Sequence, residues 1–246
     1  MTDDLKNSLT ALKLAWMRDN LDHEVAEAAR KNRPHHELIA RLVQGELAAR
    51  QCRAIERLLS QAKLAGRPTL NAFDFHWPTR INVDQVRYLF SLNFMKDHTN
   101  VVFIGPVGIG KSHLASALIV QACEQRESAL FTSAAAMINT LVEAQENGVF
   151  GSVLKRYLRV KLLAIDELGY LAVDKLGAEL LFQVLAGRYE KASTIITTNR
   201  VYSDWDKTFA NDNAMTSAVL DRVIHHCETV VIEGTSYRMK GRLPEE

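Results

Sequence analysis

One segment of the chain limits its possible folds more than any other. A short apolar run, 101–104, leads into Gly105-Pro106-Val107-Gly108-Ile109-Gly110-Lys111-Ser112, and an apolar-periodic helix follows. This is the pattern GxxxxGK[ST] in its required setting of strand, loop and helix. The glycines let backbone N–H groups converge on phosphate oxygens, and the helix N-terminus favours negative charge there. The segment predicts a phosphate-binding loop in which Lys111 reaches the β- and γ-phosphates and the Ser112 hydroxyl binds Mg²⁺.

From about residue 83 onward, short β-rich runs alternate with longer helical ones. The candidate strands are 100–104, 129–132, 161–165, 193–197 and 228–232. The candidate helices are 111–125, 134–146, 174–190 and 214–226. Such alternation predicts an α/β fold in three layers, a parallel sheet with helices on both faces. Ligands of such sheets bind beyond the carboxyl ends of the strands, and the phosphate loop falls at one of those ends.

Two acids end the apolar run 161–165. Asp166 at that strand end is the candidate ligand for Mg²⁺, and Glu167 is the candidate base that orients and deprotonates the attacking water. Neighbouring residues on a strand point in different directions, so two roles are geometrically reasonable. An Asp-Glu pair alone is more often a solvated strand end. The phosphate loop upstream favours the functional interpretation.

Polar residues also follow the next strand and its helix. Asn199 ends the strand 193–197 and is a candidate sensor of the γ-phosphate; the alternative is a polar residue that begins a turn. Arg222 lies in the helix after it and is a candidate arginine finger for a neighbouring subunit. The alternative for Arg222 is a surface arginine paired with Asp221, and the residues alone do not decide between the two.

Residues 1–66 are predicted to form a helical N-terminal domain, 67–82 a linker that packs down, and 83–246 the ATPase domain. Gly66 and Pro68 mark the end of the helical part. Between residues 30 and 67 nine basic residues stand against three acids, an excess of +6 that suggests contact with a phosphate backbone. A solvated helix face, or a dock for an acidic partner, is the alternative. A second candidate DNA contact is formed by Lys155, Arg156, Arg159 and Lys161, for which a solvated helix end is the alternative.

Composition excludes several other classes. The net charge is only +1, and the three cysteines form no CxxC pair, so neither a zinc site nor a disulfide framework is indicated. No signal peptide or membrane span is apparent, and we expect a cytoplasmic protein. The pairs His35-His36 and His225-His226 argue against a metal site, because neighbours on a helix point about 100° apart. No NKxD motif occurs, which disfavours GTP.

The quoted motifs together resemble the IstB family, helper ATPases encoded beside the transposase in bacterial insertion sequences, which is related to DnaC and DnaA within the AAA+ ATPases. The similarity covers nearly the whole chain. It includes Phe73-Asp74-Phe75, the loop through His113, 165–170, 188–190, 197–199, 220–222, His225-His226 and 234–238. Departures are small: Ser112 replaces the commoner Thr, Thr235 replaces Glu, and Thr198 replaces Ser.

The resemblance implies a Walker A loop at 105–112, a Walker B pair at Asp166 and Glu167, and a sensor at Asn199. It implies an arginine finger at Arg222, and Arg238 as a second sensor beside the nucleotide. Its expected cofactors are ATP and Mg²⁺. Its expected partners are duplex DNA without strong sequence preference, a cognate transposase and further copies of the chain.

We therefore expect an ATPase that assembles on DNA with ATP, recruits and stimulates the transposase and influences the choice of target site. A DnaC-like helicase loader and a nucleotide-gated DNA-binding protein with little turnover remain the alternatives. A small-molecule kinase is disfavoured, because the acidic pair suits activation of water.

Overall fold

The computed structural model describes residues 2–171 and 173–240. The chain divides into two compact units, Met1–Arg57 and Leu58–Glu246, and the division falls inside one long helix. The domain limits predicted from the sequence, 1–66 and 83–246 around a linker, remain a prediction, since a compact unit need not end where a domain does.

The first unit is helical, as predicted. It contains α1 (Asp3–Ala11), α2 (Ala15–Arg30) and most of α3 (His35–Gln61). The buried residues among those described in this unit are Glu24, Ala28 and Glu46, so none is a large apolar side chain. Ionic contacts therefore help to hold these helices together in place of a large apolar core.

Glu46 of α3 is the most buried of these groups, with 3% of its surface exposed. Its carboxylate accepts hydrogen bonds from the backbone N–H groups of Trp16 (2.8 Å) and Met17 (3.1 Å), at the N-terminus of α2. Arg50 and Arg53 donate to its other oxygen. A helix N-terminus has unpaired N–H groups that a carboxylate satisfies well, so one side chain fixes the start of α2 against α3.

The second unit is built on a five-stranded parallel sheet. The strands are β1 (Asn100–Ile104), β2 (Ala129–Ser133), β3 (Leu162–Leu168), β4 (Ser193–Thr198) and β5 (Cys227–Val231), in the order β2-β3-β4-β1-β5. All neighbouring pairs are parallel, and the register shifts between Ile165 and Leu168. The predicted α/β class and the five predicted strands are confirmed, while the order of strands was beyond the sequence prediction.

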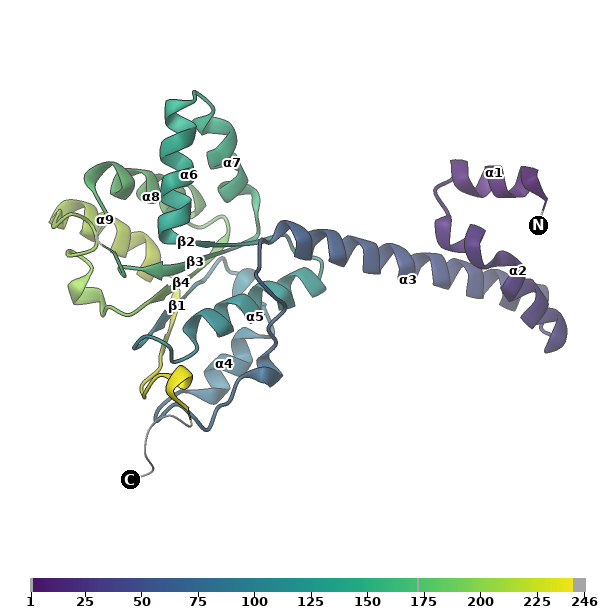
Figure 1. The fold of residues 1–246 in the computed structure, drawn as a ribbon, viewed down its shortest axis with the longest axis horizontal. Coiled ribbons are helices and arrows are strands. Elements are labelled where there is room, and N and C mark those ends of the chain that lie inside the picture. Colours follow the sequence, from purple (N-terminus) through teal and green to yellow (C-terminus); the bar gives the residue numbers. More distant parts are fainter. Residues whose placement is uncertain (1, 172, 241–246) are drawn as a thin grey trace. The chain divides into compact units, whose positions relative to one another are not determined.

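Helices cover both faces of this sheet. The long helices are α5 (Lys111–Glu124), α6 (Ala134–Glu146), α7 (Phe150–Arg159), α8 (Lys175–Arg188) and α9 (Asn213–Ile224). The short ones are α4 (Val83–Leu89), η1 (Leu70–Ala72), η2 (Asn93–Met95), η3 (Tyr202–Asp204) and η4 (Tyr237–Met239). Figure 1 shows α6 to α9 on one face of the sheet and α5 on the other. The predicted three layers are thus present, and the side chains between them are buried.

Arg188, at the end of α8, is an unusual part of this core because 1% of its surface is exposed. Its guanidinium donates to the carbonyl oxygens of Tyr157 (2.7 Å), Val160 (2.9 Å) and Ser193 (2.5 Å), and to the Thr194 hydroxyl (3.0 Å). Burial lowers the pKa of Arg188 to about 10. These bonds fasten the turn between α8 and β4 to the rest of the unit.

No helix in the described ranges is long and apolar enough to cross a membrane.

Candidate nucleotide-binding site

The loop between β1 and α5 has the conformation that its glycines allow. Gly108 and Gly110 have φ values of +77° and +104°, a region in which residues with a side chain are strained. A Cβ on Gly110 would lie 2.5 Å from the Phe73 ring, and one on Gly105 would lie 2.2 Å from the Ile232 carbonyl oxygen. Both positions therefore require glycine, and the loop leaves its N–H groups at the start of α5.

Lys111 points back into this loop. Its Nζ donates to the carbonyl oxygens of Gly105 and Pro106, each at 2.7 Å, and 9% of the residue is exposed. Burial lowers the pKa of Lys111, although the charges of Asp166 and Glu167 act in the opposite direction. Among the described residues, Lys111 donates to two neutral carbonyl oxygens, which fits a site whose negative charge is supplied by a phosphate ligand.

Asp166 of β3 bonds both to Ser112 at the start of α5 and to Thr197 at the end of β4. The Ser112 hydroxyl donates to Oδ1 of Asp166 at 2.8 Å, and the Thr197 hydroxyl donates to the same oxygen at 2.5 Å. Asp166 is 8% exposed. A hydroxyl and a carboxylate held together are hard oxygen ligands of the kind that Mg²⁺ takes, so these residues fit the predicted metal.

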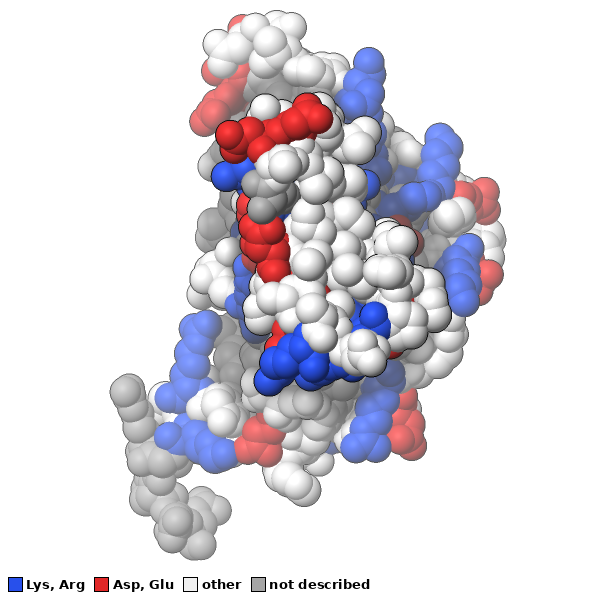
Figure 2. All heavy atoms as spheres, turned by 90° about the vertical axis from the view of Figure 1, so that its right-hand side faces the viewer, with Lys and Arg blue, Asp and Glu red and all other residues white. Residues whose placement is uncertain are grey.

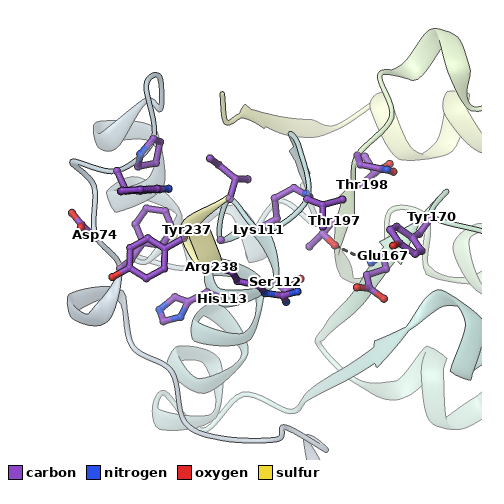
Figure 3. Close-up of a pocket in the computed structure, with 18 of the residues that line it drawn as sticks. Asp74, Lys111, Ser112, His113, Glu167, Tyr170, Thr197, Thr198, Tyr237 and Arg238 are labelled. Carbon is purple, nitrogen blue, oxygen red and sulfur yellow. Dashed lines mark hydrogen bonds between the residues drawn. The ribbon is translucent and has the colours of Figure 1, made fainter. Parts of the chain in front are cut away.

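Glu167 stands beside Asp166 in an unusual backbone conformation. Its φ is +61°, and its N–H donates to the Thr197 hydroxyl at 2.9 Å. The strand is irregular here, as the register shift to β4 shows. In a regular strand Asp166 and Glu167 would point to opposite faces. With this distortion Asp166 bonds to Ser112. Glu167 lines the cavity, as Figure 3 shows.

The end of β4 carries the predicted sensor and a residue that sequence reasoning missed. Asn199 is exposed and lines the cavity, while Thr198 accepts from the backbone N–H of Arg200 at 3.1 Å. Among the described residues, Thr197 bonds to both acidic positions, through the Asp166 carboxylate and the Glu167 N–H. The available signal was that Thr197 is one of the polar residues at the end of this apolar strand.

A cavity of about 260 Å³ lies over the loop. At its far end two distant segments meet: the Trp77 indole N–H donates to the Thr235 carbonyl at 3.0 Å, and the Trp77 and Tyr237 rings are 5.6 Å apart. Lys240 lies near both rings and bonds to Asp74 at 2.6 Å. Phe73 and His113 also line this part, with ring centroids 5.9 Å apart. The predicted linker thus forms a wall of the site (Figure 3).

The model of the family described as IstB-like ATP binding protein matches residues 7–244. The chain belongs to the IstB-like family of ATP-binding proteins. This IstB-like chain is 36% identical over 242 residues to a protein named for ATP binding in insertion sequence IS232 of Bacillus thuringiensis subsp. berliner, covering 98% of this chain and 96% of that protein.

Solved structures support the same fold. A crystal structure of the DnaC helicase loader matches with a TM-score of 0.54 and 23% identity, over 67% of this chain and 98% of that one. The replication initiator DnaA, bound to AMPPCP and single-stranded DNA, matches with a TM-score of 0.57 and 23% identity, over 70% and 52%. The IstB-like protein therefore has the predicted three-layer α/β fold, which it shares with these structures.

Most of the predicted site residues of this IstB-like protein come together. The cavity is lined by Val107 to His113, Glu167, Asn199 and Arg238. Gly105, Pro106 and Asp166 do not line it but bond to Lys111 and Ser112, which do. Arg222 does not line this cavity. It lies on α9, half-buried, where it donates to the Ala218 carbonyl at 2.9 Å and sits 4.8 Å from the Phe182 ring centroid.

Proposed function

We propose that this IstB-like protein hydrolyses ATP at sites shared between neighbouring copies, and that bound ATP holds it in assemblies on duplex DNA. These assemblies recruit and stimulate the transposase of the insertion sequence and influence target choice. Hydrolysis releases them. The family match and the insertion-sequence relative support this setting.

The observation that carries the hydrolytic part is the arrangement around Thr197. Lys111 and the loop N–H groups bind the phosphates, Ser112 and Asp166 hold the metal, and Glu167 orients the attacking water. Bound Mg²⁺ would neutralise charge that develops on the phosphates. Because Thr197 bonds to Asp166 and to the Glu167 backbone, both acids are held in place before the nucleotide arrives.

Arg222 is proposed to act on the nucleotide of the next copy. Arg222 does not line the cavity of its own chain, which argues against a role within one subunit. An arginine finger is worth about 10³–10⁵ in rate. Its contacts to Ala218 and Phe182 are with neutral groups, so the guanidinium keeps its charge available to a phosphate.

Charge distribution supports DNA contact more at α7 than at the N-terminus. Over residues 1–67 twelve basic residues stand against nine acids, a net charge of +3, and Arg41, Arg50 and Arg53 pair with glutamates. On the face that Figure 2 shows, basic side chains lie singly or in small groups, several beside an acid. Between residues 147 and 165 there are instead four bases and no acid, and all four are exposed: Lys155, Arg156, Arg159 and Lys161. We place a phosphate-backbone contact there.

The test compares three variants of the full chain for ATP binding, phosphate release and size with ATP, ADP and duplex DNA. Glu167→Gln should bind ATP normally, lose turnover and stay assembled on DNA. Arg222→Ala should bind ATP normally and lose hydrolysis. Glu124→Gln, an exposed acid at the far end of α5, is the control and should match the parent. Full ATPase activity in Arg222→Ala would refute the shared site.

The fold match to the DnaC helicase loader supports a second candidate function, the loading of a helicase. A loader would bind a replicative helicase, whereas the proposed helper binds the transposase. Parallel pull-downs with both partners in the presence of ATP separate the two. Phosphate release with and without DNA identifies a protein that only switches with nucleotide.

A further inference from the structure

Away from the nucleotide cavity, three exposed side chains with metal-binding atoms gather where α8 and α9 end. They are Glu190, His225 and His226, and one ligand atom from each lies within 4.8 Å of the others. The turns that carry them lead into β4 and β5, at the amino ends of the parallel strands. The nucleotide cavity is at the carboxyl ends, so this cluster is separate from the predicted magnesium site.

The two histidines lie side by side at the point where α9 ends. Within a helix, neighbouring side chains point about 100° apart, which argues against a shared ion. α9 ends at Ile224, so His225 is its C-cap and His226 belongs to the following turn. Their ring centroids are 4.3 Å apart. The interpretation of this pair as unsuited to a metal rested on continuous helix, which the structure does not have there.

The surrounding contacts hold the cluster in place. The Tyr189 hydroxyl lies 2.9 Å from Nδ1 of His225 and fixes the rotation of that ring. Oε1 of Glu190 lies 3.9 Å from the same nitrogen. Glu190 has a φ of +55°, and the buried Arg188 beside it fastens this turn to the core. The carboxylate is thus presented from an anchored turn.

We propose that Glu190, His225 and His226 bind a divalent transition-metal ion such as Zn²⁺. Two imidazoles and one carboxylate are a donor set that suits zinc and leaves a position for water. With bonds of about 2.0–2.1 Å the donors of a tetrahedral site lie roughly 3.3 Å apart, so small side-chain rotations close the site. His225 would bind the ion through Nε2, because the Tyr189 hydroxyl occupies its Nδ1 and acts as the outer partner that orients the ring. Magnesium prefers oxygen ligands and is excluded by the two nitrogens.

The bound ion would cross-link the end of α8 to the end of α9. Arg222 lies three residues before His225 on the same chain segment, and Phe182 of α8 already contacts it. A metal ion here would therefore restrict the movement of α9 that carries Arg222. This consequence does not depend on the nucleotide cavity.

The test titrates Zn²⁺ into the nucleotide-free full chain by calorimetry, with Cys52→Ser as the background because that exposed thiol is another zinc ligand. We expect one zinc ion per chain, lost in the double variant His225→Ala/His226→Ala and in Glu190→Gln. Tyr189→Phe should bind about tenfold more weakly. The matched control is His35→Ala/His36→Ala, a pair inside α3, which should bind zinc as the background does.

Thermal melting supplies the second readout. Zinc should raise the melting temperature of the background protein and of the α3 control but not that of the cluster variants, since a ligand stabilises only the state it binds. The single variant His226→Gln, at an exposed position, serves if the double variant folds poorly. Equal zinc binding with and without the two histidines, or no heat of binding in the background protein, would overturn the proposal.

Discussion

The phosphate end of the nucleotide cavity and its aromatic end are built in different ways. At the phosphate end, Ser112, Asp166 and Thr197 bond to one another, and Lys111 bonds to the loop carbonyl oxygens before it. At the aromatic end, the half-buried Trp77, the exposed Tyr237 and an ion pair join segments that lie 158 to 166 positions apart in the chain. The first end is held by the sheet itself. The second depends on the C-terminal segment staying in place, so the two ends should respond differently to substitution.

The largest effect is expected at the phosphate end with Lys111→Ala. This change removes a buried cation whose partners are two carbonyl oxygens and the predicted phosphates. We expect measurable ATP binding to disappear, a loss of about 2–5 kcal/mol. Calorimetry with ATP and Mg²⁺ measures it. The melting temperature without nucleotide should fall little, and ATP binding equal to that of the parent would contradict the phosphate loop.

A large effect on turnover alone is expected for Thr197→Val. The isosteric change removes the donor to Asp166 and the acceptor for the Glu167 N–H, so both acids lose their fixed positions. Small misplacements of reacting groups cost up to about 10² in rate, and we expect kcat to fall on that order with KM nearly unchanged. Thr197→Ser keeps the hydroxyl and should restore turnover. Parent-like turnover in Thr197→Val, which keeps the methyl group and lacks the hydroxyl, would contradict this role of the hydroxyl.

A moderate effect on binding is expected at the aromatic end with Trp77→Ala. If this end holds the base, the variant loses stacking worth about 1–3 kcal/mol. ATP should then bind more weakly while inorganic tripolyphosphate binds as before, since it has no base. Competition binding with the two ligands checks this. An equal loss for both would mean that Trp77 acts through the loop, by way of its contacts to 235–237.

The smallest effect is expected from the exposed ion pair between Asp74 and Lys240. The pKa of Asp74 is lowered by its bond to Lys240, and an exposed pair is screened by salt. Asp74→Asn should weaken ATP binding less than about threefold at low salt. At high salt the variant and the parent should converge. A loss larger than that of Trp77→Ala would reverse the ranking of the two ends.

Local patterns predicted the phosphate end and much of the fold. The loop 105–112 and the two acids at the end of the third predicted strand could be predicted, because neighbouring residues in the sequence determine the turn or strand end on which they lie. The aromatic end could not be predicted from local patterns, since Trp77 and Tyr237 are brought together only by the folded sheet. Helix α7 was not predicted for a different reason. The helix is amphipathic, but it begins with Phe150-Gly151-Ser152, and Gly and Ser are typical of a loop.

Two other features could not be predicted from the sequence: a contact between residues far apart in the chain, and the acids that pair with the basic residues of the N-terminal helices. Thr197 was read as a strand residue, and only the register of β3 against β4 brings its hydroxyl to Asp166. The basic excess from 30 to 67 leaves out two acids of α2. Glu24 pairs with Arg41, and Glu27 pairs with Arg30 and Lys31. A window along the sequence does not show which helix supplies the opposite charge.

The buried Glu46 makes the N-terminal helices an acid-sensitive part of the protein. Burial alone raises the pKa of Glu46, but the N–H of Met17 and the side chains of Arg50 and Arg53 outweigh it, so the pKa is lowered from its usual 4.5. The carboxylate therefore stabilises the fold fully above that value and loses its contribution as the pH falls through the lower folded value. With no large buried apolar group among the described residues of that unit, acid should unfold α1 and α2 before the sheet. Amide exchange followed from about pH 6 to 3 would record that order of events, and Glu46→Gln should weaken the pH dependence, since the paired Glu24 and Glu27 remain.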